Sequence, residues 1–268
     1  MRKKLIVSGC SFTTKDYVSS TYPDIDTSYP KWPELLAEKL DMDCINLAFS
    51  GAGNHFIFQT LCEAIIRTPR DEIGMIVAAW SQANRDDWQI YKDAFKDRMM
   101  YNETYLKGFV WHNDRLNKNG DVFSWVRSDI IRMITLQKLC ESLNIPYKQF
   151  LMISFFGGYI SGLVKTEDEI QRISEKKTGE DLRHKYPGTD KKKDMMKCCE
   201  ILLEYEDYIN KDNFIGWPSA RRIGGYHMGM KLEKPDGSAD ERYSIGKYDP
   251  HPNKLGHEKI AKEIHESF

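Results

Sequence analysis

Residues 3–12, KKLIVSGCSF, contain an apolar run typical of a buried strand that leads directly into a turn of small residues. Residues 5–8 are predicted to form the first strand of a parallel sheet. Gly9 and Cys10 are small enough to let the backbone turn sharply, so we expect the hydroxyl of Ser11 to be exposed beyond that strand. Ligands of open α/β sheets bind beyond the carboxyl ends of the strands. Ser11 is therefore the candidate nucleophile.

Two other interpretations of this turn are open. Ser11 could simply cap the turn, which is the commoner role of a serine in an isolated Gly-x-Ser sequence. Cys10 is a rival nucleophile, but neighbouring side chains point in different directions. We therefore expect the side chain of Cys10 to point away from that of Ser11.

Strand and helix patterns alternate along the chain, which is typical of an α/β fold with a parallel sheet. Further strands are predicted over residues 44–48, 74–80, 147–154 and 213–217. Helices are predicted over about 34–40, 55–67, 127–143, 195–208 and 255–268. Residues 74–80 are nearly all apolar, so this strand is expected to be central and covered on both faces.

Two long stretches interrupt the alternation. Residues 81–125 hold many aromatic side chains without clean periodicity and are too long for an ordinary connection between a strand and a helix. Residues 157–194 are rich in glycine and then strongly charged, which is typical of a solvated helical segment or a mobile flap. No internal repeat or linker is visible. We therefore predict one domain, residues 1–268, with insertions at the rim of the sheet at about 81–125 and 157–194.

Composition excludes several classes of protein. Apolar residues make up 41% of the 268 residues and charged residues 29%, which is normal for a globular domain. The formal net charge is -1, from 39 basic and 40 acidic side chains, and gives no support for a nucleic-acid partner. No apolar run is long enough to span a membrane. The run that follows the basic start is also shorter than the roughly 7–15 apolar residues of a signal peptide, so no signal peptide is predicted.

Cysteine spacing gives no sign of a zinc site. The six cysteines lack the C-x-x-C pattern, and we expect reduced, mostly buried thiols. No His-x-x-x-His pair, cluster of carboxylates or phosphate-binding loop is visible either. We therefore expect no metal and no cofactor, which also makes a flavin- or nucleotide-binding protein a weak interpretation.

The second candidate segment, DPHPN, lies near the other end of the chain, at residues 249–253. The prolines on both sides of His251 restrict the backbone, which suits a base that must be held in register. Asp249 could accept a hydrogen bond from the other ring nitrogen and fix the tautomer. Ser11, His251 and Asp249 would then supply the nucleophile, base and orienting carboxylate of acyl transfer. In the alternative interpretation the segment has a structural role only, and Asp249 and Asn253 serve as turn or cap residues of a surface loop.

An oxyanion requires hydrogen-bond donors aimed at the position where negative charge develops. The glycine turn SGAGN, residues 50–54, follows the second strand on the same rim as Ser11, and its backbone N–H groups can approach a substrate closely. It could equally be no more than a turn. Gln82 or Asn84, after the third strand, could add a side-chain amide.

These segments resemble, in this order, the sequence blocks of the SGNH/GDSL hydrolase family, whose members are esterases, lipases and carbohydrate acetylesterases. Residues 9–12 are similar to the first block, with Ser11 at the nucleophile position and Cys10 where aspartate is usual. Residues 46–51, NLAFSG, are similar to the second block, with Gly51 at the oxyanion position.

The other two blocks are matched with departures. Asp249–Pro252 resembles the last block, with His251 as base, but the spacing from aspartate to histidine is one residue shorter than usual. The family's third block is Gly-x-Asn-Asp, where this chain has WSQAN at residues 80–84. By strand register Gln82 stands nearest the asparagine position, and Asn84 is the nearest asparagine.

The resemblance implies a flavodoxin-like, three-layer α/β/α fold with a central parallel sheet. It implies a serine esterase that acts on a small-molecule or carbohydrate ester, such as an O-acetyl or other short acyl group. Ser11, His251 and Asp249 would form the catalytic triad, and the backbones of Ser11 and Gly51 with Gln82 or Asn84 would form the oxyanion hole.

The same combination of motifs resembles SGNH-like proteins of phage genomes. It therefore implies a cytoplasmic or virion-associated protein that has a virion or homo-oligomer partner. The alternative is a structural or binding module of the same fold, for example a virion component, with weak or no catalysis. The altered third block and the two insertions favour this alternative.

Overall fold

The computed structural model describes residues 2–83, 85, 87–89, 105–106, 122–155, 191–217, 227–234 and 237–268. Most of the two predicted insertions, 81–125 and 157–194, lies outside these residues. Within the first, β4 (Trp88–Gln89) and β5 (Tyr105–Leu106) pair as a short antiparallel ribbon.

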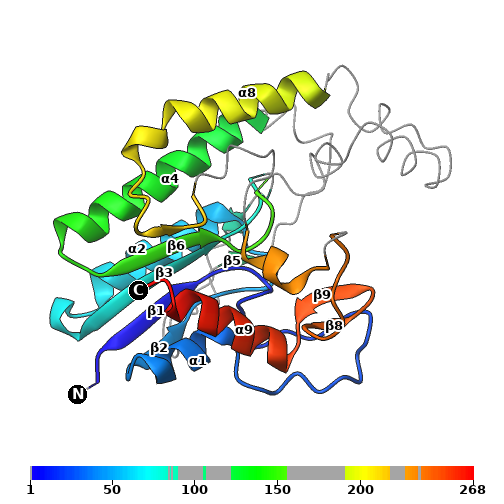
Figure 1. Cartoon of the computed structure of the whole chain (residues 1–268). Helices are drawn as coiled ribbons and strands as arrows, with labels where there is room; N and C mark the ends of the chain where they lie inside the picture. The colour runs from blue at the N-terminus through cyan, green and yellow to red at the C-terminus, as the bar shows by residue number, and fades with distance from the viewer. Residues whose placement is uncertain are drawn as a thin grey trace.

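A five-stranded sheet forms the centre of the molecule (Figure 1). Its strands are β1 (Lys4–Ser8), β2 (Asp43–Asn46), β3 (Ile73–Trp80), β6 (Tyr147–Leu151) and β7 (Phe214–Ile215). They lie in the order β2-β1-β3-β6-β7, and every neighbouring pair is parallel. This is the strand order of flavodoxin-like folds. It confirms the predicted fold class and the central place of β3.

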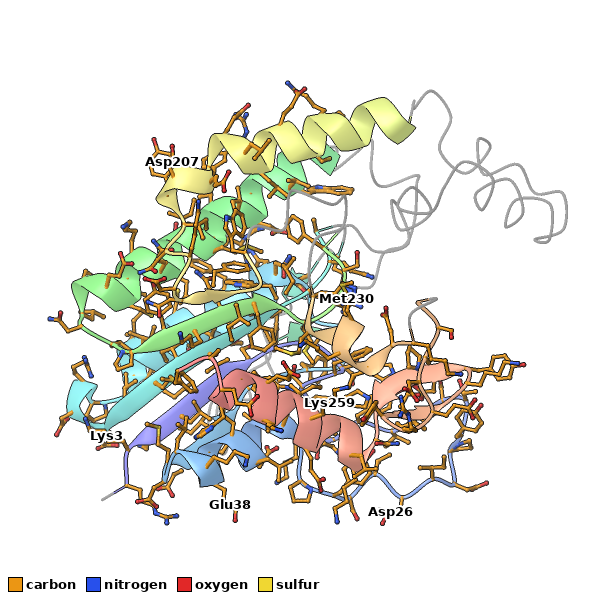
Figure 2. The ribbon with its side chains drawn as sticks, in the orientation of Figure 1. Lys3, Asp26, Glu38, Asp207, Met230 and Lys259 are labelled. Carbon is orange, nitrogen blue, oxygen red and sulfur yellow. The ribbon has the colours of Figure 1, made fainter. Side chains whose placement is uncertain are left out.

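Helices cover both faces of the sheet (Figure 1). On one face lie α1 (Trp32–Lys39) and α9 (Lys254–His265), and on the other lie α2 (Asn54–Arg67), α4 (Val122–Ser142) and α8 (Lys191–Glu204). Successive side chains of a strand point to opposite faces. Accordingly, Leu5 and Val7 belong to the core with α1 and α9, and Ile6 to the core with α2, α4 and α8. Figure 2 shows side chains filling both layers.

Several element boundaries differ from those predicted. Helix α4 begins at Val122 instead of about 127, and α8 begins at Lys191 instead of about 195. Charged residues at the start of α8 obscure its apolar periodicity. Strand β6 ends at Leu151, not at 154, because its partner β3 ends at Trp80, which pairs with Leu151. Residues 228–232, where no helix or strand was predicted, form a 3₁₀ helix.

The segment that carries His251 is a strand rather than a loop. Strand β9 (Asp249–Pro252) pairs antiparallel with β8 (Ser244–Gly246). Proline lacks the N–H that a strand residue usually donates, so a sequence with two prolines does not predict a strand here. A two-stranded ribbon tolerates them because each strand has an unpaired edge.

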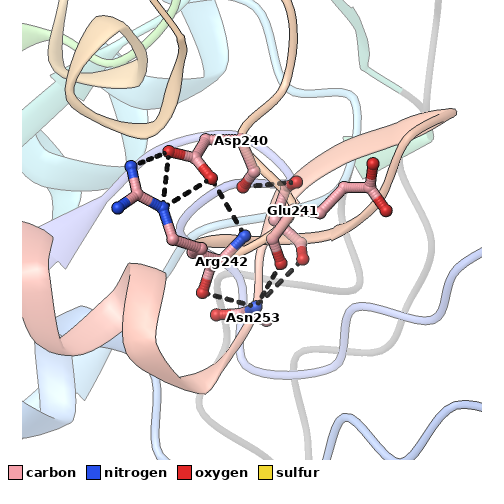
Figure 3. Close-up of polar contacts among 5 residues, drawn as sticks. Asp240, Glu241, Arg242 and Asn253 are labelled. Carbon is pink, nitrogen blue, oxygen red and sulfur yellow. Dashed lines mark hydrogen bonds and ion pairs between the residues drawn. The ribbon is translucent and has the colours of Figure 1, made fainter.

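Asn253 fastens this ribbon to α9 (Figure 3). Its Oδ1 atom accepts a hydrogen bond from the backbone N–H of Gly256 at 3.0 Å and so caps the helix. Its Nδ2 atom donates to the carbonyls of Arg242 at 3.1 Å and Ser244 at 2.9 Å. The expectation that Asn253 could serve as a cap is therefore confirmed, and the cap holds the ribbon two residues beyond His251.

Within the residues described, no helix combines the length and the apolar character needed to cross a membrane. Five cysteines are described as free thiols, of which Cys10, Cys140 and Cys198 are buried.

Candidate active site

Ser11 lies in a tight turn directly after β1. The carbonyl of Cys10 accepts hydrogen bonds from the backbone N–H groups of Thr13 at 2.9 Å and Thr14 at 3.1 Å. A Cβ atom at Gly9 would lie 2.5 Å from Oγ1 of Thr13, so only glycine fits there. Cys10 is completely buried in the apolar core, whereas Ser11 is partly exposed. The burial of Cys10 removes it as a rival nucleophile.

The structure brings Ser11, His251 and Asp249 together in one chain of hydrogen bonds. The Oγ atom of Ser11 lies 2.8 Å from Nε2 of His251. The Nδ1 atom of His251 lies 2.6 Å from Oδ1 of Asp249, and its backbone N–H donates to the same oxygen at 3.0 Å. An ionised carboxylate only accepts hydrogen bonds, so the imidazole carries its proton on Nδ1. Its Nε2 atom is then free to accept the Ser11 proton.

The carboxylate of Asp249 is buried and saturated with donors. Its side chain is 4% exposed. Its Oδ2 atom accepts hydrogen bonds from the hydroxyls of Tyr17 at 2.9 Å and Ser19 at 2.5 Å. Burial alone would raise the pKa of Asp249, but the hydrogen bonds from Ser19 and His251 lower it overall. Asp249 is therefore ionised at neutral pH.

Aromatic rings surround His251. The Tyr17 ring stacks on the imidazole, with centroids 3.9 Å apart and planes inclined by 24°, and the Phe12 ring lies 4.5 Å away. Burial lowers the pKa of His251, Asp249 opposes that shift, and the positive charge of Arg85 lowers the pKa further. His251 is therefore neutral at pH 7, as a general base must be.

The glycine turn lies against the exit of β1. The backbone N–H of Phe49 donates to the carbonyl of Gly9 at 3.0 Å, which ties the turn to the segment that carries Ser11. Gly51 has φ +86°, a conformation that favours glycine. Within the part of the chain that the structure describes, the backbone N–H groups of Ser11 and Gly51 have no hydrogen-bond partner. These are the two backbone donors that the resemblance described above implies for the oxyanion hole.

Arg85 connects the glycine turn with the segment after β3. Its Nη1 atom donates to the carbonyl of Ala52 at 3.1 Å, and its Nε atom donates to Oε1 of Gln82 at 3.2 Å. The second contact fixes the orientation of the Gln82 amide, because its oxygen faces Arg85 and its NH₂ group faces elsewhere. Asn84, the other candidate amide, lies outside the described residues.

A buried network lies behind the glycine turn. The Oδ1 atom of Asn54 accepts from the backbone N–H of Ser81 at 2.7 Å, and its Nδ2 atom donates to Oδ2 of Asp129 at 2.7 Å. Asp87 accepts from the N–H groups of Gly53 at 2.7 Å and Phe56 at 2.8 Å, at the first turn of α2. These hydrogen bonds connect the glycine turn with α2, with the segment directly after β3 and with α4.

Three residues of the site were not predicted. Tyr17 and Ser19 lie in a loop without periodicity, and no feature of the sequence marks them as partners of Asp249. Arg85 directly follows the segment 80–84. Its positive charge next to the amide side chains of Gln82 and Asn84 was the one feature of the sequence that could have indicated a role in the site. Among the described residues, no group of three His, Cys, Asp or Glu side chains could hold a metal ion.

Comparisons with known proteins find similarity in structure only. No protein-family model and no curated protein sequence matches the chain. A protein assigned to the G-D-S-L lipolytic family from Desulfitobacterium hafniense DCB-2 is 12% identical, with 99% of both chains covered and a TM-score of 0.48.

Two further solved structures are similar to this chain in overall structure. The psychrotrophic esterase EstA from Pseudoalteromonas sp. is 12% identical, with 99% of this chain and 96% of that chain covered and a TM-score of 0.40. A protein assigned as an SGNH hydrolase from Slackia heliotrinireducens is 10% identical, with 100% and 99% covered and a TM-score of 0.40. Each likeness is one of overall structure at low identity, so the case for a function rests on the residues of this chain.

Proposed function

We propose that this protein is a serine hydrolase that cleaves an ester, with O-acetyl or other short acyl groups on a carbohydrate as its substrate class. The observation that carries the proposal is the unbroken hydrogen-bond chain from Ser11 through His251 to Asp249, with contacts of 2.8 and 2.6 Å. Nucleophile and base within hydrogen-bond reach, and a third group that orients the base, are what acyl transfer requires. The proposal that the substrate is a carbohydrate ester rests on the resemblance of the motifs to those of a family that includes carbohydrate acetylesterases.

In the first half of the reaction, His251 Nε2 takes the proton of Ser11 as Oγ attacks the ester carbonyl carbon. The carbonyl oxygen becomes an oxyanion. Collapse of this intermediate breaks the ester bond, and His251 gives the proton to the departing alcohol. The acyl group is then bound to Ser11.

In the second half, His251 takes a proton from water, which attacks the acyl carbon. The acid is released and the proton returns to Ser11. Asp249 stays ionised throughout and stabilises the imidazolium that forms in each half.

The oxyanion hole in this proposal consists of the backbone N–H groups of Ser11 and Gly51 and the side-chain amide of Gln82. Arg85 supports Gln82 over Asn84, because it holds the Gln82 oxygen and leaves the NH₂ group as the donor. Loss of one such donor typically costs about 100–1000-fold in rate. We expect Gln82→Ala to lower kcat by about 100–1000-fold. We expect Asn84→Ala to lower kcat far less.

The test of the proposal is hydrolysis of p-nitrophenyl acetate and of an O-acetylated sugar by the wild type, Ser11→Ala and a control. Ser28→Ala is a suitable control, because Ser28 is an exposed serine of the loop between β1 and α1. Activity in the wild type and the control, but not in Ser11→Ala, supports a serine hydrolase. Equal activity in all three would overturn the assignment of Ser11. No activity in any of them, with stable binding to a particle or partner, would favour the binding module.

A further inference from the structure

We propose that Tyr17 is a positioning residue, which holds His251 and Asp249 in register through two separate contacts. Its ring stacks on the imidazole of His251 at 3.9 Å, and its hydroxyl donates to Oδ2 of Asp249 at 2.9 Å. One side chain thus touches both the base and the group that orients the base. The inference rests on the proposed function, because it concerns the same site.

The hydroxyl contact fixes the rotation of the carboxylate. Asp249 uses Oδ1 for the backbone and ring N–H groups of His251 and Oδ2 for Tyr17 and Ser19. With donors on both oxygens, the carboxylate cannot turn without breaking charge-assisted hydrogen bonds, which are about twice as strong as neutral ones. Oδ1 is therefore held toward Nδ1 of His251.

The ring contact fixes the imidazole. Stacking within 4 Å prevents the His251 ring from swinging toward the space that Tyr17 fills, and the side chain of His251 is only 19% exposed. Its Nε2 atom therefore stays directed at Ser11. A base held in this way needs no reorganisation before it takes the proton.

Tyr17 is itself held by the loop between β1 and α1, which lies beside the β8–β9 ribbon. Asp26 marks this loop in Figure 2. The hydroxyl of Thr27 donates to the Tyr17 carbonyl at 2.8 Å, and the hydroxyl of Tyr29 donates to the Pro252 carbonyl at 3.2 Å. The Ser19 hydroxyl oxygen accepts from the backbone N–H of Tyr22 at 3.0 Å. The loop between β1 and α1, which follows Ser11, thus also forms hydrogen bonds to β9, the strand that carries His251.

The hydroxyl of Tyr17 should also influence the pKa of His251, because it donates a hydrogen bond to Asp249. Asp249 on β9 raises the pKa of His251, and Arg85 after β3 lowers it. The Tyr17 ring on the loop stacks on the imidazole, and His257 on α9 has its own pKa lowered in part by the positive charge of His251. Without the Tyr17 hydroxyl, the negative charge of Asp249 is less neutralised and favours the imidazolium more strongly. The pKa of His251 should therefore rise in Tyr17→Phe.

The test compares Tyr17→Phe, which keeps the ring, Tyr17→Leu, which removes ring and hydroxyl, and Tyr29→Phe as a matched control. Tyr29 lies on the same loop and also donates to the ribbon, but to a backbone carbonyl. We expect Tyr17→Phe, which loses the hydrogen bond to Asp249, to lower kcat by about 3–10-fold. We expect Tyr17→Leu, which also loses the ring contact with His251, to lower kcat by roughly 100-fold. KM should be nearly unchanged in both variants. The acid limb of the kcat/KM profile should move to higher pH in Tyr17→Phe and stay in place in Tyr29→Phe.

An NMR titration of the His251 ring in the same variants gives a readout that needs no activity. A higher pKa of His251 in Tyr17→Phe than in wild type and Tyr29→Phe supports the positioning role, even if the wild type hydrolyses no ester and the proposed function fails. Wild-type kcat and an unchanged His251 pKa in Tyr17→Phe would overturn it. If Tyr17→Leu does not fold, Tyr17→Phe alone decides the outcome.

Discussion

The Oγ atom of Ser11 lies 2.8 Å from the Nε2 atom of His251, although the two residues are 240 positions apart in the sequence. The contact depends on how α9 and the β8–β9 ribbon pack against the start of the chain. His257 on α9 contributes to this packing, because its Nδ1 atom accepts a hydrogen bond from the backbone N–H of Trp32 at 3.2 Å. The candidate site is therefore built where the segment after the first strand meets the ribbon that precedes the last helix.

Asp249→Asn should lower kcat by about 10³–10⁴-fold, because an amide NH₂ group facing Nδ1 of His251 would favour the wrong tautomer. The side chain is nearly isosteric, so the fold should survive. Asp26→Asn is the matched control, since Asp26 is exposed on the same loop as Tyr17 (Figure 2). Steady-state kinetics with p-nitrophenyl acetate measure the effect. Similar kcat values for the two variants would contradict the orienting role of Asp249.

Activity should fall with decreasing pH as His251 becomes protonated, and this acid limb should lie below the ordinary pKa of histidine, about 6.5. Burial lowers the pKa of His251, and the charge of Arg85 lowers it further. Arg85→Gln should therefore raise the pKa and move the acid limb to higher pH, whereas Arg85→Lys, which keeps the charge, should not. Profiles of kcat/KM against pH check this. An acid limb that stays in place in Arg85→Gln would show that the charge of Arg85 does not lower the pKa of His251.

Arg85→Gln should also disturb the Gln82 amide, so kcat at pH 8 should fall, but by less than the roughly 100–1000-fold expected for loss of the donor itself. Combining Arg85→Gln with Gln82→Ala separates the two effects. If Arg85 acts through Gln82, the double variant should be about as active at pH 8 as Gln82→Ala. Fully additive losses would show that Arg85 acts independently.

Asp129→Asn should stabilise the protein more at pH 8 than at pH 4. Burial raises the pKa of Asp129 from 3.8 to about 7, against the opposing effect of Arg132. A carboxyl group whose pKa is raised on folding contributes stability below its unfolded pKa, and that contribution is lost as the pH rises through the folded pKa. The advantage of the asparagine variant should therefore grow between pH 4 and pH 8, by an amount on the order of a few kcal/mol. Urea unfolding at both pH values measures it, and a pH-independent difference would contradict the raised pKa.

The sequence predicted the parallel sheet well because β1 and β3, which pair near its centre, are mostly apolar runs. The apolar run over residues 74–80 indicated a central strand, and β3 (Ile73–Trp80) is the third of five strands. The alternation of Leu5, Ile6 and Val7 between the two helical layers follows from strand geometry alone. Helix ends were harder to predict, since charged first turns such as that of α8 carry no apolar signal.

For the candidate site, the residues that carry reactive groups could be predicted, but their supporting contacts could not. Ser11 was marked by the small residues before it and His251 by the prolines around it. Tyr17 and Ser19 reach Asp249 only because the loop folds back onto the ribbon, and such a contact has no local pattern in the sequence. The strand character of β9 was hidden by the same prolines that marked His251 as restricted.

The role of Ser11 as the activated nucleophile is tested most directly by labelling of the intact protein with a fluorophosphonate probe, followed by mass spectrometry of the modified peptide. The probe forms a bond to a serine oxygen only where a base activates that oxygen and donors stabilise the negative charge. If Ser11 is the activated nucleophile, one modification is expected, on Ser11, which disappears in Ser11→Ala and forms much more slowly in Asp249→Asn. Absence of labelling, or labelling of another residue that persists in Ser11→Ala, would contradict it.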